Sequence, residues 1–220
     1  MCGRVRDPEE HSEIKIRIDK YYLEPRERRT NVPPTSDVPV VTSPEGMRTL
    51  EPMRWGIIPP WAKDMKIGYS TFNARADGVT TKPAFRGAWR AGQRCLVLTG
   101  GFYEWRKPDK QPFAVSLGNR GVMPMAGLWE CWNGPEGPVK SCTIITTEAN
   151  EMMAEIHDRM PVILDANDWP AWLGEEEATA DQLLAMLRPF PAGRMILWPV
   201  SRDVGNVKNT GPELEEPIRL

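Results

Sequence analysis

The chain has 220 residues, of which 40% are hydrophobic and 26% are charged, the composition of an ordinary globular protein. No apolar run approaches the roughly 18 residues that a membrane span needs, and the charged N-terminus lacks the apolar stretch of a secretory signal, so we expect a cytoplasmic protein. The net charge of -2, taken alone, argues against a nucleic-acid-binding protein.

The predicted elements are many short strands and a few helices. In chain order, strands are expected over residues 38–42, 48–58, 94–98, 102–105, 113–117, 123–132, 141–147, 159–164 and 195–200. Helices with capping residues at their starts, among them Asn150, are expected over residues 149–156, 165–172 and 179–187, while residues 9–22 have mixed helical and strand character. This pattern predicts an α+β fold, a single β-rich domain over residues 1–220.

Cysteines and histidines are few. The four cysteines stand at positions 2, 95, 131 and 142, without C-x-x-C spacing, and the chain has two histidines. This pattern predicts reduced thiols rather than a disulfide framework, and it provides no metal centre. We therefore expect neither a metal nor another cofactor.

Charge is divided unevenly along the chain. Residues 1–110 hold 20 Lys and Arg against 14 Asp and Glu, whereas residues 111–220 hold 8 against 16. Much of the positive charge is arginine, which favours forked contacts with phosphate or carboxylate groups. Composition alone nevertheless favours a solvated surface with a chance imbalance.

Cys2 is the first candidate for chemistry. Because it is small, we expect an aminopeptidase to remove Met1, which leaves an amine of pKa about 8 beside a thiol of pKa about 8.5, both partly reactive at neutral pH. An amine and a thiol on adjacent carbons react with an aldehyde, first as an imine and then as a thiazolidine ring. Position alone favours an accidental cysteine, but Gly3 permits close backbone approach and Arg4 supplies a phosphate contact.

Three further segments carry candidate side chains. Asn73 offers both a donor and an acceptor, and Arg75 faces the same side if the segment is extended; by itself this pair also fits a loop that ends in a helix cap. Glu104 stands between two aromatic residues that need burial, which favours a proton shuttle over a solvent-facing glutamate. His157, at a junction between a predicted helix and strand, is expected to titrate near pH 7, although a capped core histidine is the commoner case.

The ordered set of motifs resembles the SRAP family, the SOS-response-associated peptidases, also called abasic-site processing proteins. The matching strings are MCGR at 1–4, NVPP at 31–34, WGIIP at 55–59, NARA at 73–76, GFYEW at 101–105, AGLW at 126–129, ITT at 145–147, HDRMP at 157–161 and GPEL at 211–214. The resemblance covers nearly the whole chain. It implies one domain with a barrel-like antiparallel sheet core flanked by short helices, and covalent capture of abasic sites in single-stranded DNA.

The resemblance also implies roles for individual residues. Cys2 forms the crosslink, Asn73 positions its amine and thiol, Glu104 transfers protons, and His157 acts as a second acid or base. The residues implied to contact DNA are Gly3, Arg4, Pro34, Trp61, Arg75, Arg86, Thr147 and Arg159. We accordingly expect a monomer that binds single-stranded DNA containing abasic sites, associates with the nucleoid through that DNA, and has no membrane partner. Self-cleavage at Met1 is a further activity that the family name implies.

Two alternatives remain open at this stage. An N-terminal-nucleophile amidohydrolase, like the class II glutamine amidotransferases, also begins Met-Cys-Gly and uses the thiol to attack an amide. A noncatalytic single-strand DNA-binding module would use the tryptophans and arginines without any need for Cys2.

Overall fold

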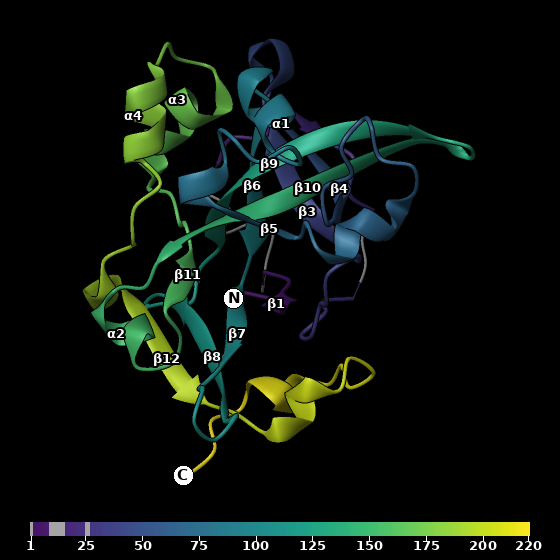
Figure 1. Cartoon of the computed structure of the whole chain (residues 1–220). Helices are drawn as coiled ribbons and strands as arrows, with labels where there is room; N and C mark the ends of the chain where they lie inside the picture. Colours follow the sequence, from purple (N-terminus) through teal and green to yellow (C-terminus); the bar gives the residue numbers. More distant parts are fainter. Residues whose placement is uncertain (1, 9–15, 25–26) are drawn as a thin grey trace.

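Strands dominate the computed structural model of the protein, which describes residues 2–8, 16–24 and 27–220 (Figure 1). The strands are β1 (Val5–Arg6), β2 (Lys20–Tyr21), β3 (Asp37–Thr42), β4 (Thr49–Trp55), β5 (Asn73–Arg75), β6 (Arg94–Thr99), β7 (Gly101–Trp105), β8 (Pro112–Leu117), β9 (Met123–Gly134), β10 (Gly137–Glu148), β11 (Arg159–Pro161) and β12 (Met195–Pro199). The α-helices are short: α1 (Arg86–Arg90), α2 (Glu151–Ala154), α3 (Trp169–Leu173) and α4 (Ala180–Ala185). The predicted α+β class is confirmed.

The centre of the fold is a β-barrel. Strand β3 pairs with β4, β4 with β10, β10 with β9, β9 with β6, and β6 again with β3, which closes the ring. Most of these pairs are antiparallel, but β4 and β5 both run parallel to β10, and β2 runs parallel to β4. The expected barrel-like core is therefore present, with a mixed sheet rather than a wholly antiparallel one.

Alternating side chains along the barrel strands make two cores. On β6, Cys95 and Val97 belong to the cluster that fills the barrel interior, while Leu96 and Leu98 belong to a second cluster on the outside. This is the period of two that a strand imposes on its side chains. Helices α1, α3 and α4 contribute to the outer cluster. The inner cluster includes Cys2, so the N-terminal segment lies against one end of the barrel.

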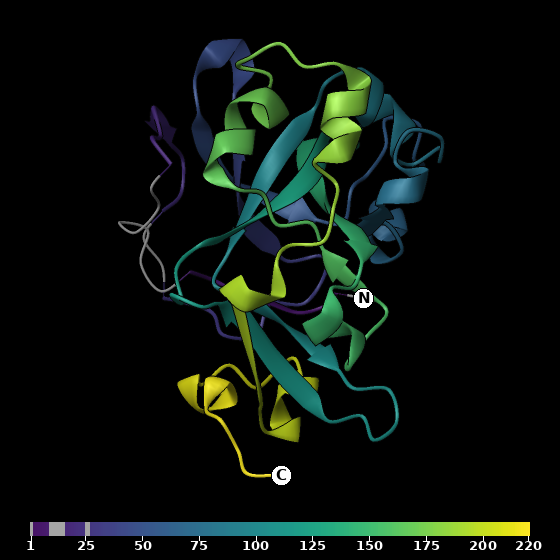
Figure 2. The same ribbon diagram turned by 90° about the vertical axis from the view of Figure 1, so that its left-hand side faces the viewer.

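A second, smaller sheet lies beside the barrel and runs in the order β1-β7-β8-β12 (Figures 1 and 2). Gly101, at the start of β7, has φ of +146°, and a Cβ there would collide with the Arg6 guanidinium and the Val115 carbonyl oxygen. Only glycine fits this position. The break between two strands that the sequence predicted at residues 100–101 is therefore the place where β7 begins and where the Arg6 side chain of β1 packs against the Gly101 backbone.

Local sequence signals account for several helix starts. The Asn150 side chain accepts a hydrogen bond from the Met153 backbone N–H at 2.9 Å, and Thr179 forms a capping box with Gln182 at the start of α4. The region predicted helical over residues 165–172 consists of a 3-10 turn (Ala166–Asp168) followed by α3.

Other predicted boundaries need correction. The strand predicted over residues 159–164 ends at Pro161, since proline has no N–H to continue the ladder. Sequence reasoning also missed the short elements β1, β5 and α1. Part of the stretch of mixed character, residues 9–15, lies outside the described residues; its described remainder contains β2 and no helix.

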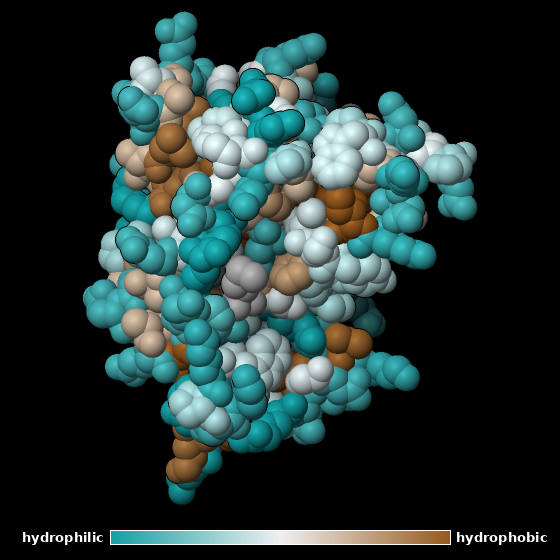
Figure 3. All heavy atoms as spheres, viewed as in Figure 1, coloured by the Kyte–Doolittle hydropathy of each residue, from teal (hydrophilic) through white to brown (hydrophobic). Residues whose placement is uncertain are grey.

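The described surface has no extended apolar area on the face in Figure 3, where brown residues form small separate groups among teal and pale ones. In the described part of the chain, no helix combines the length and apolarity of a membrane span.

Candidate active site

Cys2 is buried where the N-terminal segment meets β7. Val5 on β1 pairs with Phe102 on β7, and the Tyr103 backbone N–H donates to the Arg4 carbonyl oxygen at 2.9 Å. Continuing this antiparallel register brings the start of the chain alongside Glu104. The short β1 strand, which the sequence did not reveal, is therefore what carries the candidate nucleophile to the candidate proton shuttle.

Asn73 holds the backbone of Cys2 from the barrel side. Its residue pairs with Ile144 of β10, and its Nδ2 donates to the Cys2 carbonyl oxygen at 2.7 Å. The Asn73 Oδ1 atom is buried and has no hydrogen-bond partner among the described residues. A buried acceptor without a donor is costly, so this atom is ready to receive an N–H or O–H from a substrate or from a processed N-terminus.

The Cys2 thiol is held in its protonated form. Burial raises its pKa well above the ordinary value, and the nearby Glu104 carboxylate raises it further. The expectation of a partly ionised thiol applies to the chain after loss of Met1; with Met1 present, the burial of Cys2 and the Glu104 carboxylate favour the protonated thiol. The sequence could not show the cause, because it does not reveal how deeply the second residue is buried.

Glu104 is buried on β7, as the flanking aromatic residues predicted, with a relative exposure of 5%. One of its carboxylate oxygens, Oε1, accepts a hydrogen bond from the Trp105 backbone N–H at 3.3 Å. Its charge raises the pKa of both the Cys2 thiol and the His157 imidazole. The carboxylate thus lies within electrostatic reach of both groups, and we refer to Cys2, Asn73, Glu104 and His157 as the reactive cluster.

His157 stands in the connection between α2 and β11. Its Nδ1 lies 3.0 Å from the Arg159 backbone N–H, which donates to it, and 2.9 Å from a carboxylate oxygen of Asp158. Accepting the backbone N–H requires an unprotonated Nδ1. Burial also lowers the pKa of His157, although the Glu104 and Asp158 carboxylates oppose this effect. The lowered pKa favours the neutral imidazole at neutral pH, whereas the Asp158 carboxylate oxygen beside Nδ1 favours the protonated form.

Predicted DNA contacts gather along β10. Arg75 of β5 pairs with Thr146, and Met160 of β11 pairs with Thr147 from the other side. The Arg159 guanidinium donates to the Thr146 carbonyl oxygen at 2.6 Å, and its pKa is lowered mainly by burial and also by the positive charge of Arg75. The charge of Arg75 is thus close enough to affect Arg159, while the carboxylates of Asp77, Asp158 and Glu148 act on the Arg159 pKa in the opposite direction.

Other predicted contacts are placed differently. Arg4 is turned into the protein, where its Nη1 donates to Asn31 Oδ1 at 2.6 Å and to the Val204 carbonyl oxygen at 2.7 Å. Its guanidinium would have to give up these bonds to reach a phosphate. Gly3 and Pro34 are half-buried, and Arg86 is exposed at the first residue of α1.

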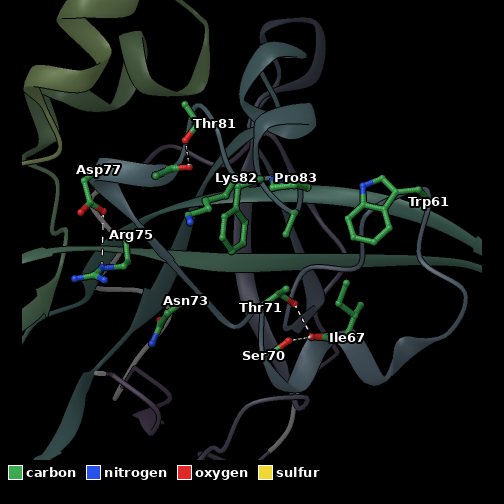
Figure 4. Close-up of a pocket in the computed structure, with 13 residues that line it drawn as sticks. Trp61, Ile67, Ser70, Thr71, Asn73, Arg75, Asp77, Thr81, Lys82 and Pro83 are labelled. Atoms are coloured by element: carbon green, nitrogen blue, oxygen red, sulfur yellow. Dashed lines mark hydrogen bonds and ion pairs between the residues drawn. The ribbon is translucent and has the colours of Figure 1, made fainter.

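A pocket of about 610 Å³ opens beside Asn73 (Figure 4). Arg75 and Trp61, two predicted DNA contacts, line it together with Asn73, and Trp61 is 60% exposed. Lys82, which sequence reasoning did not single out, lines the same pocket. Its only sequence signal is its place before a proline near the start of α1, and nothing in that pattern distinguishes it from other surface lysines.

The Glu104 carboxyl group lies within electrostatic reach of the Cys2 thiol and of the His157 imidazole, an arrangement that can support thiol chemistry. The match to known families is more specific. Residues 1–207 match the family described as SOS response associated peptidase (SRAP). The chain belongs to this family, which confirms the resemblance seen in the sequence motifs.

Curated relatives are similar over most of the chain. It is 40% identical over 223 residues to the Bacillus subtilis protein called abasic site processing protein YoqW, with 98% of this chain and 99% of the relative covered. It is 39% identical over 221 residues to the abasic site processing protein YoaM of the same organism, covering 97% of each. The chicken (Gallus gallus) abasic site processing protein HMCES is 36% identical over 199 residues, with 79% of this chain and 59% of the relative covered.

Solved structures share the fold. A protein from Bacteroides thetaiotaomicron superposes with a TM-score of 0.77 at 25% identity, over 87% of this chain and 86% of that chain. A protein from Bordetella bronchiseptica superposes with the same TM-score at 23% identity, over 91% of this chain and all of the other.

Proposed function

We propose that the protein is an abasic-site processing protein, which binds single-stranded DNA and joins an abasic sugar covalently to Cys2 once Met1 has been removed. The observation that carries the proposal is the hydrogen bond from Asn73 to the Cys2 backbone, together with the buried Glu104 carboxylate, which lies within electrostatic reach of Cys2 and of the half-buried His157. The names of the curated relatives, which describe abasic-site processing, support the same substrate.

The reaction starts from the open aldehyde form of the abasic deoxyribose. The freed Cys2 amine adds to the aldehyde carbon, and loss of one water leaves an imine. The thiol sulfur then attacks the imine carbon, while the thiol proton moves to the nitrogen and a five-membered thiazolidine ring closes. The overall change is aldehyde plus aminothiol giving thiazolidine and one water, so no oxidant or cofactor is needed.

Glu104 has two tasks in this sequence. It assists sugar ring opening, and it receives or returns protons as water leaves and sulfur attacks. The raised pKa of the Cys2 thiol fits this order of steps, because a neutral thiol waits while the amine reacts first. Its proton is released only when the developing imine nitrogen can accept it.

Asn73 and His157 have different tasks at the aldehyde carbon of the sugar. Asn73 orients the amine that attacks this carbon, and His157 exchanges protons there. Asn73 Oδ1, which is buried without a partner, accepts a hydrogen bond from the freed amine in this proposal. Neutral His157 serves as a second base and, once protonated, as the acid that helps to reverse the link. Arg75, Thr147 and Arg159 hold the phosphates on either side of the sugar, whereas Arg4 serves mainly to fix the N-terminal segment.

The family name also supports a thiol-dependent self-cleavage that removes Met1, which we include in the proposal as the step that frees the amine. This step can be measured separately by the N-terminal mass of the protein. A Cys2→Ala variant that still loses Met1 would assign its removal to a cellular aminopeptidase instead.

The proposal is tested by incubating the purified protein with single-stranded DNA that carries one abasic site. We expect a band of reduced mobility that survives heat and denaturant. Cys2→Ala should give none, and undamaged DNA of the same sequence should give none with either protein. Absence of the band with wild-type protein, or an equal band with Cys2→Ala, would contradict the proposal. A glutaminase assay on the same processed protein tests the amidohydrolase alternative.

A further inference from the structure

The His157–Asp158 pair is held in place by backbone hydrogen bonds on both sides. The His157 backbone N–H donates to the Met153 carbonyl oxygen at 2.8 Å, and the Asp158 carbonyl oxygen accepts a hydrogen bond from the Ala149 backbone N–H at 3.1 Å. The His157 side chain is 16% exposed, whereas that of Asp158 is 68% exposed. Both residues line a cavity of about 430 Å³. The pair therefore places a mostly buried ring against a carboxylate that reaches solvent.

Two groups compete for the Nδ1 atom of His157. The Arg159 backbone N–H donates to it at 3.0 Å, which requires a Nδ1 without a proton. The Asp158 Oδ1 atom lies 2.9 Å from the same nitrogen, and this contact is favourable when Nδ1 carries a proton. Protonation of the ring therefore exchanges the partner of Nδ1, from the Arg159 backbone to the Asp158 carboxylate.

Lys107, in the connection between β7 and β8, shares this carboxylate with the imidazole. Its Nζ atom donates to Asp158 Oδ1 at 3.2 Å, so that one oxygen faces both the ammonium group and His157. The hydrogen bond from Lys107 lowers the pKa of Asp158, which keeps the carboxyl group ionised at neutral pH. Lys107 therefore offsets part of the negative charge that Asp158 presents to the ring.

Charged groups on several elements act on the His157 imidazole. Burial has the largest effect on its pKa and lowers it. The carboxylates of Glu104 on β7 and of Asp158 raise this pKa, while the N-terminal amine and Lys107 lower it. Two further carboxylates, those of Glu148 and Glu155, line the same cavity. The protonation of His157 thus depends on a balance of opposing charges, in which Asp158 acts by direct contact.

We propose that Asp158 is a positioning residue for His157: its carboxylate fixes the ring through Nδ1 and stabilises the protonated form, while Lys107 limits this stabilisation. The inference rests on the proposed function, which makes protonated His157 the acid that helps to reverse the DNA link. A carboxylate at one imidazole nitrogen sets the orientation of a histidine and stabilises its cation, and the other nitrogen remains for proton exchange. Asp158 and Lys107 together then set how readily His157 acts as an acid.

The step that this arrangement serves is the opening of the thiazolidine ring. The C–S bond breaks with its electron pair on sulfur, the nitrogen lone pair forms the C=N bond of an iminium ion, and His157 gives its proton to the departing sulfur. Water then adds to the iminium carbon, and cleavage of the C–N bond returns the aldehyde and the protonated amine. The rate of reversal should therefore follow the fraction of His157 that carries a proton.

The first test observes the protonation of His157 directly, by NMR titration of its imidazole C–H signal without DNA. Because the chain has two histidines, a His11→Gln background leaves a single imidazole to follow. Asp158→Asn should weaken proton binding to His157 about three-fold, a modest change because the lost contact is partly exposed, and move the titration midpoint to lower pH. Lys107→Gln should move the midpoint to higher pH, since the full charge of Asp158 then acts on the ring.

Glu155→Gln is the matched control, because it removes one exposed carboxylate from the lining of the same cavity. Its midpoint should move less than half as far as that of Asp158→Asn. An unmoved midpoint in Asp158→Asn, or an equal displacement in the control, would overturn the inference. A midpoint that Lys107→Gln leaves in place or moves to lower pH would overturn the role of Lys107. The three substituted side chains are exposed, so the variants should fold, which thermal melts check.

The second test follows reversal of the link across pH. An adduct with labelled abasic DNA is formed, and an excess of unlabelled abasic DNA then traps released protein, so that loss of the labelled band gives the rate. The wild-type rate should fall as the pH rises through the midpoint of His157. The profile of Asp158→Asn should be displaced to lower pH, as its NMR midpoint is. A slower rate at every pH with an unmoved midpoint would indicate a merely structural role and would overturn the inference.

The two tests separate this inference from the proposed function. If the NMR midpoints move as expected but wild-type protein forms no adduct with abasic DNA, the proposed function fails, while the control of His157 by Asp158 stands. If the adduct forms and reverses but the NMR midpoints do not move, the proposed function stands and the inference is overturned.

Discussion

Two regions at opposite sides of the N-terminal segment use charged groups in opposite ways. On one side, Arg6 is buried, and its guanidinium donates to Glu215, Gly100, Val115 and Ser116. On the other side, the reactive cluster contains a buried amide oxygen without a partner, next to cations that have few partners. In the first region, which we call the clamp, both terminal nitrogens of the Arg6 guanidinium donate hydrogen bonds, and only its Nε atom is buried without a partner. The second region holds groups in readiness for a ligand.

The clamp ties the end of the chain to its beginning. Arg28 binds Glu215 with two hydrogen bonds of 2.8 and 2.7 Å, and Arg6 binds the same carboxylate at 2.9 Å. The Asn31 side chain donates to backbone carbonyl oxygens of Val204, Asn206 and Asn209. Arginines close in sequence to Cys2 are therefore held by contacts within the protein, while Arg75 on β5 and Arg159 on β11 are the ones that the proposed function assigns to DNA.

The largest expected effect is on the clamp. Arg6→Ala should lower the free energy of unfolding by about 3–5 kcal/mol, because it removes a buried guanidinium with four hydrogen-bond partners and leaves the Glu215 carboxylate with Arg28 alone. Denaturant unfolding followed by tryptophan fluorescence measures this. Arg75→Ala, on an exposed side chain of the site, should change the same quantity by less than about 0.5 kcal/mol. Similar losses for both variants would contradict the division into two regions.

The next effect is on the rate of adduct formation. Glu104→Gln keeps the shape of the side chain but removes its capacity to accept a proton, so adduct formation with abasic DNA should slow by about 100-fold or more. Single-turnover gel assays at saturating DNA measure the rate. The unfolding free energy serves as the control and should not fall, since a buried carboxylate is replaced by a neutral group. An unchanged rate would remove Glu104 from the mechanism.

A smaller effect is expected at the cations around β10. Arg75→Gln should weaken binding of single-stranded DNA several-fold and reduce the salt slope by about 0.7. Arg4→Gln should instead reduce stability and leave the slope unchanged, because its guanidinium is held by Asn31 and Val204. Anisotropy titrations at several salt concentrations separate the two. A slope that depends on Arg4 as strongly as on Arg75 would show that the clamp opens to DNA.

The smallest effect concerns pH. The pKa of His157 is lowered in the folded protein, chiefly by burial, so below about pH 6.5 the unfolded chain binds this proton more readily than the folded one. Its contribution to stability is therefore full above that pH and is lost as the pH falls. His157→Gln should flatten this part of the stability profile between pH 7 and 5. A decline as steep as in wild type would place its origin elsewhere.

Motifs predicted the reactive cluster better than they predicted the groups around it. Cys2, Glu104 and His157 were found because each is an unusual residue in its local context, and the structure brings Glu104 within electrostatic reach of both Cys2 and His157. Arg4 shows the limit of this reasoning. Its place in the first motif suggests a phosphate contact, but its inward direction follows from the pairing of β1 with β7, which no local pattern reveals.

The strands of the barrel were predictable because their apolar residues form clear runs. The short strands β1 and β5 were not, since two or three residues are too few for a periodic pattern and their pairing depends on partners 70 or more positions away. Lys82 was missed for a related reason: nothing in its local sequence shows that it lines the pocket beside Asn73, which forms only in the folded chain.

The most direct test of the account is the chemical identity of the DNA link. After reaction with abasic DNA without a reductant, nuclease and trypsin digestion should leave the sugar remnant on the peptide Cys2-Gly3-Arg4, with a mass equal to peptide plus aldehyde minus one water. Neither a free thiol nor a free amine should remain on that peptide. A remnant attached to a lysine, or a tripeptide recovered unmodified from the crosslinked fraction, would contradict the account.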